Sequence, residues 1–233
     1  MDAAFFAGFN QDLHSPSRWE AFYQSQRAAH PHRNLPAQTP ALPRLDGEWL
    51  FNDMMKNARA PDPWMFPALQ ALQQSQRFLV AALSNTVIFP PGHPLYQPDA
   101  QLQMDPLRVM FDVFVSSAHV GLRKPDPQIY RLALDKVNRF ARAHADTERG
   151  RALGWSKTDD VIKPGDVVFL DDIGENLKAA KAVGFRTIKV PLGKAFEAVE
   201  QLEEVTGLEL AGAYPKIPIR PDFQGSAGPK AKI

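Results

Sequence analysis

From Trp64 onwards, short apolar runs alternate with segments in which apolar residues recur every three or four positions. The apolar runs end in small or polar residues and have the length and composition of buried strands. They cover residues 77–86, 109–118, 167–171 and 186–190. The periodic segments predict helices. They cover residues 64–75, 124–143, 174–184 and 193–207.

The order of these elements indicates the fold class. Strands that alternate with helices over residues 64–207 predict an α/β fold with a mostly parallel, Rossmann-like sheet and helices on both faces. Residues 144–166 are polar and charged, so we expect them to form an excursion at the surface.

The two ends of the chain have different patterns. In residues 1–63, two segments with helical spacing, 17–30 and 47–60, flank a proline-rich stretch. This favours a helical, cap-like region in front of an α/β core at 64–207. Residues 208–233 become rich in proline, glycine and lysine, and we expect a loose C-terminal tail.

The charge and composition argue against several classes of partner. With 27 Lys and Arg against 26 Asp and Glu, the net charge of +1 gives no field that would attract nucleic acid or an anionic membrane. Cysteine is absent, which excludes disulfides, thiolate metal sites and cysteine nucleophiles. No run approaches the roughly 18 apolar residues of a membrane span, and the first residues lack the pattern of a secretory signal.

We therefore expect a soluble, cytoplasmic protein. The alternative is a peroxisomal location, because Ala231, Lys232 and Ile233 are similar to a serine-lysine-leucine address.

Candidate site residues occur where predicted strands end. Ser84 and Asn85 end the first strand, Lys124 follows the second, and Asp171 and Asp172 end the third. Because ligands of open parallel sheets bind at the carboxyl ends of the strands, we expect these side chains to meet. Adjacent carboxylates favour a hard cation such as Mg²⁺, and the other groups can hold phosphate oxygens. The set predicts phosphoryl chemistry assisted by Mg²⁺.

Each group also has a purely structural explanation. Ser84 and Asn85 could begin a turn, Lys124 could be a solvated loop lysine, and the two aspartates could cap the next helix. Because all of these residues follow the ends of predicted strands, a shared binding site is favoured over the separate structural explanations. The six histidines show no metal-binding spacing such as H-E-x-x-H. We expect His119, beside the sequence SSA, to pack or lie in a loop rather than to serve a serine triad.

Three segments carry a resemblance to a known family: AALSNT (81–86), VGLRKPDPQIYRLAL (120–134) and VVFLDDIGENLKAAKAVGFRTI (167–188). They resemble motifs II, III and IV of the haloacid dehalogenase superfamily of hydrolases, in the branch that includes the N-terminal phosphatase domain of soluble epoxide hydrolase. The resemblance covers about residues 64 to 191, and residues 1–63 are similar to the family's cap.

The resemblance implies a role for each candidate residue. Ser84 and Asn85 would bind the transferring phosphoryl group, and Lys124 would balance its charge and orient the nucleophile. Asp172 would ligate Mg²⁺, with Asp171 supporting the site. In the family an aspartate attacks phosphate, and a second aspartate two residues later acts as general acid and base.

That D-x-D pair, at the end of an N-terminal apolar strand, is not found in this sequence. Asp2 and Asp12 do not follow a convincing strand, and Asp46 with Glu48 has the right spacing but lies in the cap-like region. The family's first strand lies at the centre of its sheet. The resemblance therefore implies a core without its usual first strand and with a gap between strands.

Three explanations stay open: a fragment of an active phosphatase, a diverged relative that binds without turnover, or a protein whose gap is filled by the tail or by a second chain. The leading hypothesis is a Mg²⁺-dependent phosphatase acting on a small phosphorylated metabolite or lipid. The alternative is a catalytically inactive binding or interaction protein on the same fold. The sequence leaves the oligomeric state open.

Overall fold

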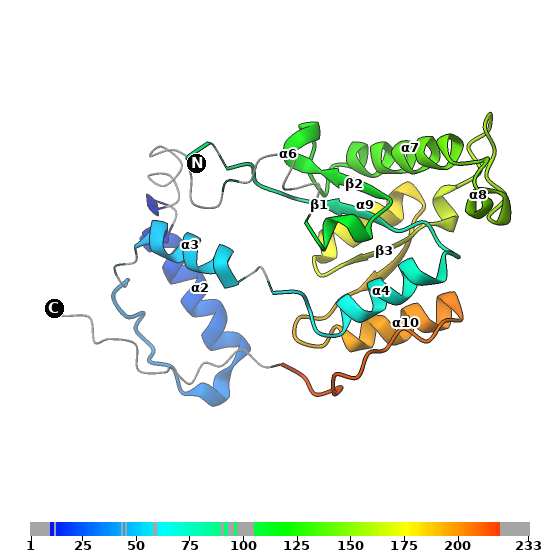
Figure 1. Cartoon of the computed structure of the whole chain (residues 1–233). Coiled ribbons are helices and arrows are strands. Elements are labelled where there is room, and N and C mark those ends of the chain that lie inside the picture. Colours follow the sequence, from blue (N-terminus) through cyan, green and yellow to red (C-terminus); the bar gives the residue numbers. More distant parts are fainter. Residues whose placement is uncertain are drawn as a thin grey trace. The chain divides into compact units, whose positions relative to one another are not determined.

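The computed structural model describes residues 10–11, 13–42, 44, 46–57, 60–89, 91–92, 96 and 105–219 (Figure 1). The chain divides into two compact units, residues 1–60 with 88–96, and residues 61–87 with 97–233. Asp2 and Asp12 lie outside the described residues, as do Ala231, Lys232 and Ile233.

The first unit is helical, as its pattern predicts. Helix α2 (Pro16–Ala29) begins with proline after Ser15, whose hydroxyl accepts a hydrogen bond from the Arg18 amide. A short 3₁₀ turn, η1 (Pro31–Arg33), follows, and then helix α3 (Gly47–Asn57). The proline-rich stretch lies along α2, because Trp19 donates to the Pro40 carbonyl and Tyr23 to the Pro36 carbonyl, at 2.8 and 3.1 Å.

The second unit alternates strands and helices in the predicted order. Its strands are β1 (Ala81–Ser84), β2 (Val113–Ser116), β3 (Val168–Asp171) and β4 (Arg186–Lys189). Its helices and 3₁₀ turns are α4 (Met65–Ser75), η2 (Arg108–Met110), α6 (Ser117–Val120), α7 (Pro127–Ala143), α8 (Glu148–Ala152), η3 (Pro164–Asp166), α9 (Gly174–Val183) and α10 (Phe196–Thr206).

The second strand is shorter than predicted. Residues 109 and 110 belong to η2, because the Asp105 carboxylate accepts from the amides of Leu107 and Arg108 and turns the chain there.

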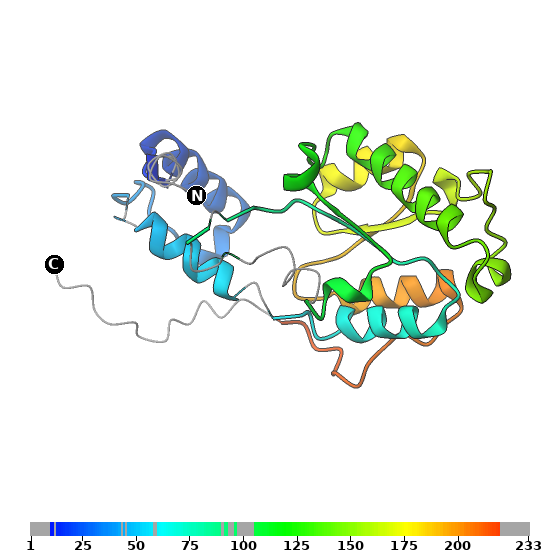
Figure 2. The same ribbon diagram turned by 45° about the horizontal axis from the view of Figure 1, so that its top comes forward.

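The strands form two parallel pairs, β1 with β2 and β3 with β4, and not one continuous sheet. Apolar clusters cover both faces. One packs Leu83, Val115 and Phe169 under α7 and α9, and the other packs Val168 and Leu170 against α4 and α10. Figures 1 and 2 show α7 beside α9 on one side of the strands and α4 beside α10 on the other. The prediction of parallel strands with helices on both faces is confirmed.

The surface excursion at 144–166 is anchored to the sheet by Arg149. The Arg149 guanidinium donates to both oxygens of Asp112, at 2.7 and 2.9 Å, and also to the Phe78 carbonyl. The Asp112 carboxylate in turn accepts from the Val80 amide at 2.9 Å. This bidentate pair therefore joins α8 to the beginnings of β1 and β2.

The expectation of a loose tail is wrong for residues 208–219. Leu210 is only 1% exposed, and the amides of Leu210 and Ala211 both donate to the Glu203 carboxylate. Further along, Trp64 donates from its indole to the Pro215 carbonyl at 3.1 Å. Apolar surface on α4 and α10 thus holds a segment whose composition suggested disorder.

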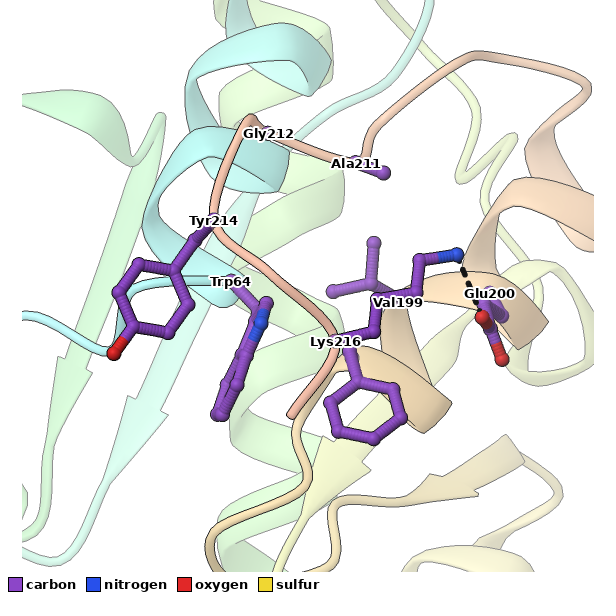
Figure 3. Close-up of a pocket in the computed structure, with 8 residues that line it drawn as sticks. Trp64, Val199, Glu200, Ala211, Gly212, Tyr214 and Lys216 are labelled. Atoms are coloured by element: carbon purple, nitrogen blue, oxygen red, sulfur yellow. Dashed lines mark hydrogen bonds and ion pairs between the residues drawn. The ribbon is translucent and has the colours of Figure 1, made fainter. Parts of the chain in front are cut away.

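Figure 3 shows the small hollow where this segment crosses the core. The Trp64 ring makes edge contacts with Phe196 and Tyr214, at 5.3 Å between ring centroids in each case, and Lys216 pairs with Glu200 at 2.7 Å. None of the predicted site residues lines this hollow. We therefore assign it to the packing of the tail.

Within the described parts of the chain, no helix is both long and apolar enough to span a bilayer.

Leu210→Ala tests whether the tail segment is packed. Because the side chain is fully buried, we expect the free energy of unfolding to fall by about 2–4 kcal/mol in urea titrations. Leu192→Ala is the matched control, since Leu192 is 83% exposed and its truncation should cost less than about 0.5 kcal/mol. Equal effects of the two substitutions would contradict the packing described above.

Candidate active site

The loop after β1 is fixed to the loop that carries Lys124. The Lys124 amide donates to the Asn85 side-chain oxygen at 2.8 Å, and the Asn85 side-chain nitrogen donates to the Lys124 carbonyl at 3.0 Å. The Asn85 side chain thus donates one hydrogen bond to the Lys124 backbone and accepts another from it, which fixes this backbone at the edge of the sheet. Asn85 therefore positions Lys124, and its predicted contact with phosphate stays a prediction.

The Lys124 side chain reaches the end of β3. Its Nζ lies 2.7 Å from Asp171 Oδ2, and the two side chains are only 11% and 4% exposed. The same ammonium lies 5.4 Å from the centroid of the Phe169 ring, a distance suited to a cation–π contact. The structure thus brings together Asn85, Lys124 and Asp171, three of the residues predicted from the strand ends.

Asp171 is held in its ionised form. Its Oδ1 accepts from the Ile173 amide and from the Asn176 side chain, both at 2.9 Å. Burial acts to raise the pKa of Asp171, but the hydrogen bonds from Lys124, Asn176 and Ile173, together with the Lys124 charge, outweigh it and hold the pKa below its ordinary value.

Tyr130 of α7 lies beside this group. Burial, with a contribution from the negative charge of Asp171, raises the pKa of Tyr130 to about 12, and its hydroxyl donates to the Asn176 carbonyl at 2.9 Å. At neutral pH the Tyr130 phenol is therefore neutral, and it lies beside the ion pair of Asp171 with Lys124.

Asp172 is exposed beside the start of α9, in contrast to its buried neighbour. Both oxygens of Asp171 already accept hydrogen bonds, so Asp172 offers the freer carboxylate of the two. No group of three or more acidic or histidine side chains that could hold a metal occurs among the residues that the structure describes. The residues present suit Mg²⁺ bound through one or two carboxylates, with water or phosphate as further ligands.

A hydroxyl network at the end of β2 was not predicted. Ser116, the register partner of Ser84, shares hydrogen bonds with Thr86 at 2.5 Å and with the His119 ring at 2.7 Å. The Ser117 hydroxyl accepts from the Thr86 amide at 2.9 Å. His119 is therefore bound in a short chain of hydroxyls that holds the loop after β1. The sequence signal for this hydroxyl network is the group of polar residues that directly follows the apolar strand.

Of the candidate substitutes for the D-x-D pair, Asp46 with Glu48 falls among the described residues, and both belong to the helical unit. The Asp46 carboxylate accepts from the Trp49 amide at 3.0 Å and caps α3 in the helical unit, and Glu48 belongs to the first turn of that helix. Asp171 is the carboxylate that contacts Lys124 in the described part of the chain. The nucleophile expected from the resemblance is not identified there.

About half of this chain is similar in sequence to parts of known proteins. The chain is 37% identical over 111 residues to bifunctional epoxide hydrolase 2 of Sus scrofa, and 33% identical over 114 residues to acyl-CoA dehydrogenase family member 10 of Mus musculus. Each match covers 48% of this chain, but only 15% and 8% of the respective relative. The matched region is thus a small part of both relatives.

Among solved structures, a dehalogenase with an intermediate complex aligns with 82% of this chain and 73% of its own, at a TM-score of 0.42 and 19% identity. The model of the haloacid dehalogenase-like hydrolases matches residues 24–184, which include every predicted site residue from Ser84 to Asp172. The resemblance carried by the three sequence segments is confirmed, and the chain belongs to the haloacid dehalogenase-like hydrolase family.

Proposed function

We propose that the chain acts on a small phosphorylated metabolite or lipid as a Mg²⁺-dependent phosphatase. The observation that carries the proposal is the position of the Lys124 ammonium. Asn85, directly after β1, holds the Lys124 backbone, and the Lys124 ammonium pairs with Asp171 at the end of β3, where ligands of parallel sheets bind.

Lys124 and Ser84 are the groups that would hold the phosphoryl oxygens. Among the described residues, Asp171 accepts from one of the three N–H groups of the Lys124 ammonium, so we expect the other two to donate to an anion. Asp171 keeps the ammonium in place and balances its charge. Preorganised donors of this kind favour the charge that develops during phosphoryl transfer.

Asp172 would hold the metal, and Mg²⁺ bound there would neutralise charge on the phosphoryl group. The Asp171 oxygens are committed to Lys124, Ile173 and Asn176, which supports the assignment of Asp172 as the metal ligand.

A second candidate is a protein that binds phosphate without turnover. It is favoured by the observation that the described residues around Lys124 place no second carboxylate, besides the engaged Asp171, in contact with the ammonium. The two candidates share the ligand and differ in whether the phosphoester bond is broken.

Asp172→Asn separates the metal-dependent reaction from background. If the proposal is correct, the purified chain hydrolyses p-nitrophenyl phosphate with Mg²⁺ and loses this activity in EDTA. We expect Asp172→Asn to lower kcat/KM by about 100-fold or more. Loss of one preorganised group that stabilises charge in the transition state typically has an effect of this size. Asp146→Asn is the matched control, because Asp146 is 74% exposed and pairs with Lys157 away from the strand ends.

Activity indifferent to both Mg²⁺ and Asp172→Asn would contradict the proposed mechanism. Absence of turnover, together with binding of inorganic phosphate that Lys124→Met weakens in calorimetry, would establish the second candidate instead.

Lys124→Met tests the ion pair independently of catalysis. Removing the ammonium leaves the Asp171 carboxylate buried without its main partner, so its pKa should rise and stability at pH 7 should fall by about 3–5 kcal/mol. In the native chain, the lowered pKa means that Asp171 stabilises the fold fully above its ordinary pKa near about 4, and that this contribution is lost as the pH falls further.

In Lys124→Met, the raised pKa means that Asp171 takes up a proton as the pH falls towards its ordinary value near about 4, which relieves the buried charge. The stability difference between the native chain and the variant should therefore shrink between pH 7 and pH 4 in urea titrations. Lys157→Met, at a lysine whose side chain is 64% exposed, is the control and should change stability by less than about 0.5 kcal/mol. A difference that grows on acidification would overturn the assignment of Asp171 as the stabilised carboxylate.

A further inference from the structure

Tyr130 of α7 is fully buried, and its hydroxyl makes a contact that leads to the candidate site. The hydroxyl donates to the Asn176 carbonyl at 2.9 Å. Asn176 belongs to the first turn of α9, where a helical carbonyl already accepts from the amide four residues later. The phenol therefore adds a hydrogen bond that fixes this turn to α7.

Asn176 connects this contact to the ion pair. Its side chain is also buried, and its Nδ2 donates to Asp171 Oδ1 at 2.9 Å. The other carboxylate oxygen, Asp171 Oδ2, accepts from Lys124 Nζ at 2.7 Å. The backbone of Asn176 thus contacts Tyr130, and its side chain contacts the carboxylate that holds the Lys124 ammonium. A shift of the first turn of α9 would move this donor away from Asp171.

A buried tyrosine also has a purely structural explanation. The Tyr130 ring makes edge contacts with the rings of Phe169 and Phe185, at 5.5 and 6.1 Å between centroids. Such packing stabilises a core without any role in a site, and every buried hydroxyl needs a hydrogen-bond partner. The identity of the acceptor favours a further role, because the residue that accepts from Tyr130 is the same residue that donates to Asp171.

We propose that Tyr130 is a positioning residue for the reaction, and that its hydroxyl acts through Asn176 on Asp171 and Lys124. Because the side chain is fully buried, Tyr130 does not contact the substrate. Its hydroxyl holds the first turn of α9, Asn176 orients the Asp171 carboxylate, and this carboxylate holds the Lys124 ammonium. The effect on turnover rests on the phosphatase activity proposed above, whereas the coupling between Tyr130 and Asn176 does not.

Tyr130→Phe tests the effect on turnover. The substitution removes the hydroxyl and keeps the ring with its contacts to Phe169 and Phe185. With p-nitrophenyl phosphate and Mg²⁺, we expect kcat to fall by about tenfold, as is typical when a group that orients a site residue is lost. KM should change by less than about twofold, since a misplaced charge weakens the transition state more than the bound ground state.

Tyr23→Phe is the matched control. Tyr23 is also buried, and its hydroxyl likewise donates to a backbone carbonyl, that of Pro36, but in the helical unit. Both variants lose one such hydrogen bond, so their unfolding midpoints in urea should fall by similar amounts. We expect Tyr130→Phe alone to lower kcat. A purely structural role of Tyr130 would leave the two variants equally active.

The side-chain amide of Asn176 gives a readout that needs no turnover. In the native chain, we expect its protons to exchange slowly with water in nitrogen-15 NMR spectra, because the group is buried and bonded to Asp171. Tyr130→Phe should speed this exchange by at least about fivefold, which corresponds to the loss of one ordinary hydrogen bond. Tyr23→Phe should leave the exchange unchanged.

The proposal is overturned if the Asn176 amide stays as protected in Tyr130→Phe as in the native chain, because any effect on kcat would then not pass through Asn176. It is equally overturned if the amide loses its protection while kcat is retained, or if Tyr23→Phe speeds the exchange as much. If the native chain shows no turnover, the proposed function fails, and amide exchange alone decides whether Tyr130 positions Asn176.

Discussion

The candidate site depends on one buried ion pair, between Lys124 Nζ and Asp171 Oδ2 at 2.7 Å. Lys124 is held by Asn85 at the end of β1, and Asp171 is the last residue of β3, so this contact joins the carboxyl ends of two strand pairs that share no backbone hydrogen bonds. Removal of either partner would leave a buried charge, which costs far more than the loss of an exposed pair. Loss of either partner would therefore destabilise the fold, and the pair fixes the position of the Lys124 side chain at the carboxyl ends of the strands.

A second constraint is that the strands in the described part of the chain form two separate parallel pairs. Parallel strands are normally covered on both faces and paired on both edges, because unpaired backbone groups are costly when they are removed from water. Here the faces are covered, with Tyr130 and Phe185 packed on one side and Ile188 and Leu202 on the other. Helices α7 and α9, which contact each other, thus hold the pairs in one layer without a continuous ladder.

The sequence predicted the elements that depend on local pattern. Helix α7 follows from its apolar spacing and from Pro127 after the capping Asp126. The meeting of Lys124 with Asp171 was also predictable, because parallel strands bring their carboxyl ends to one edge. The use of Asn85 as a clamp was not, since it requires the path of a loop 39 residues away. Burial of Leu210 was missed because it depends on surface that only the folded core provides.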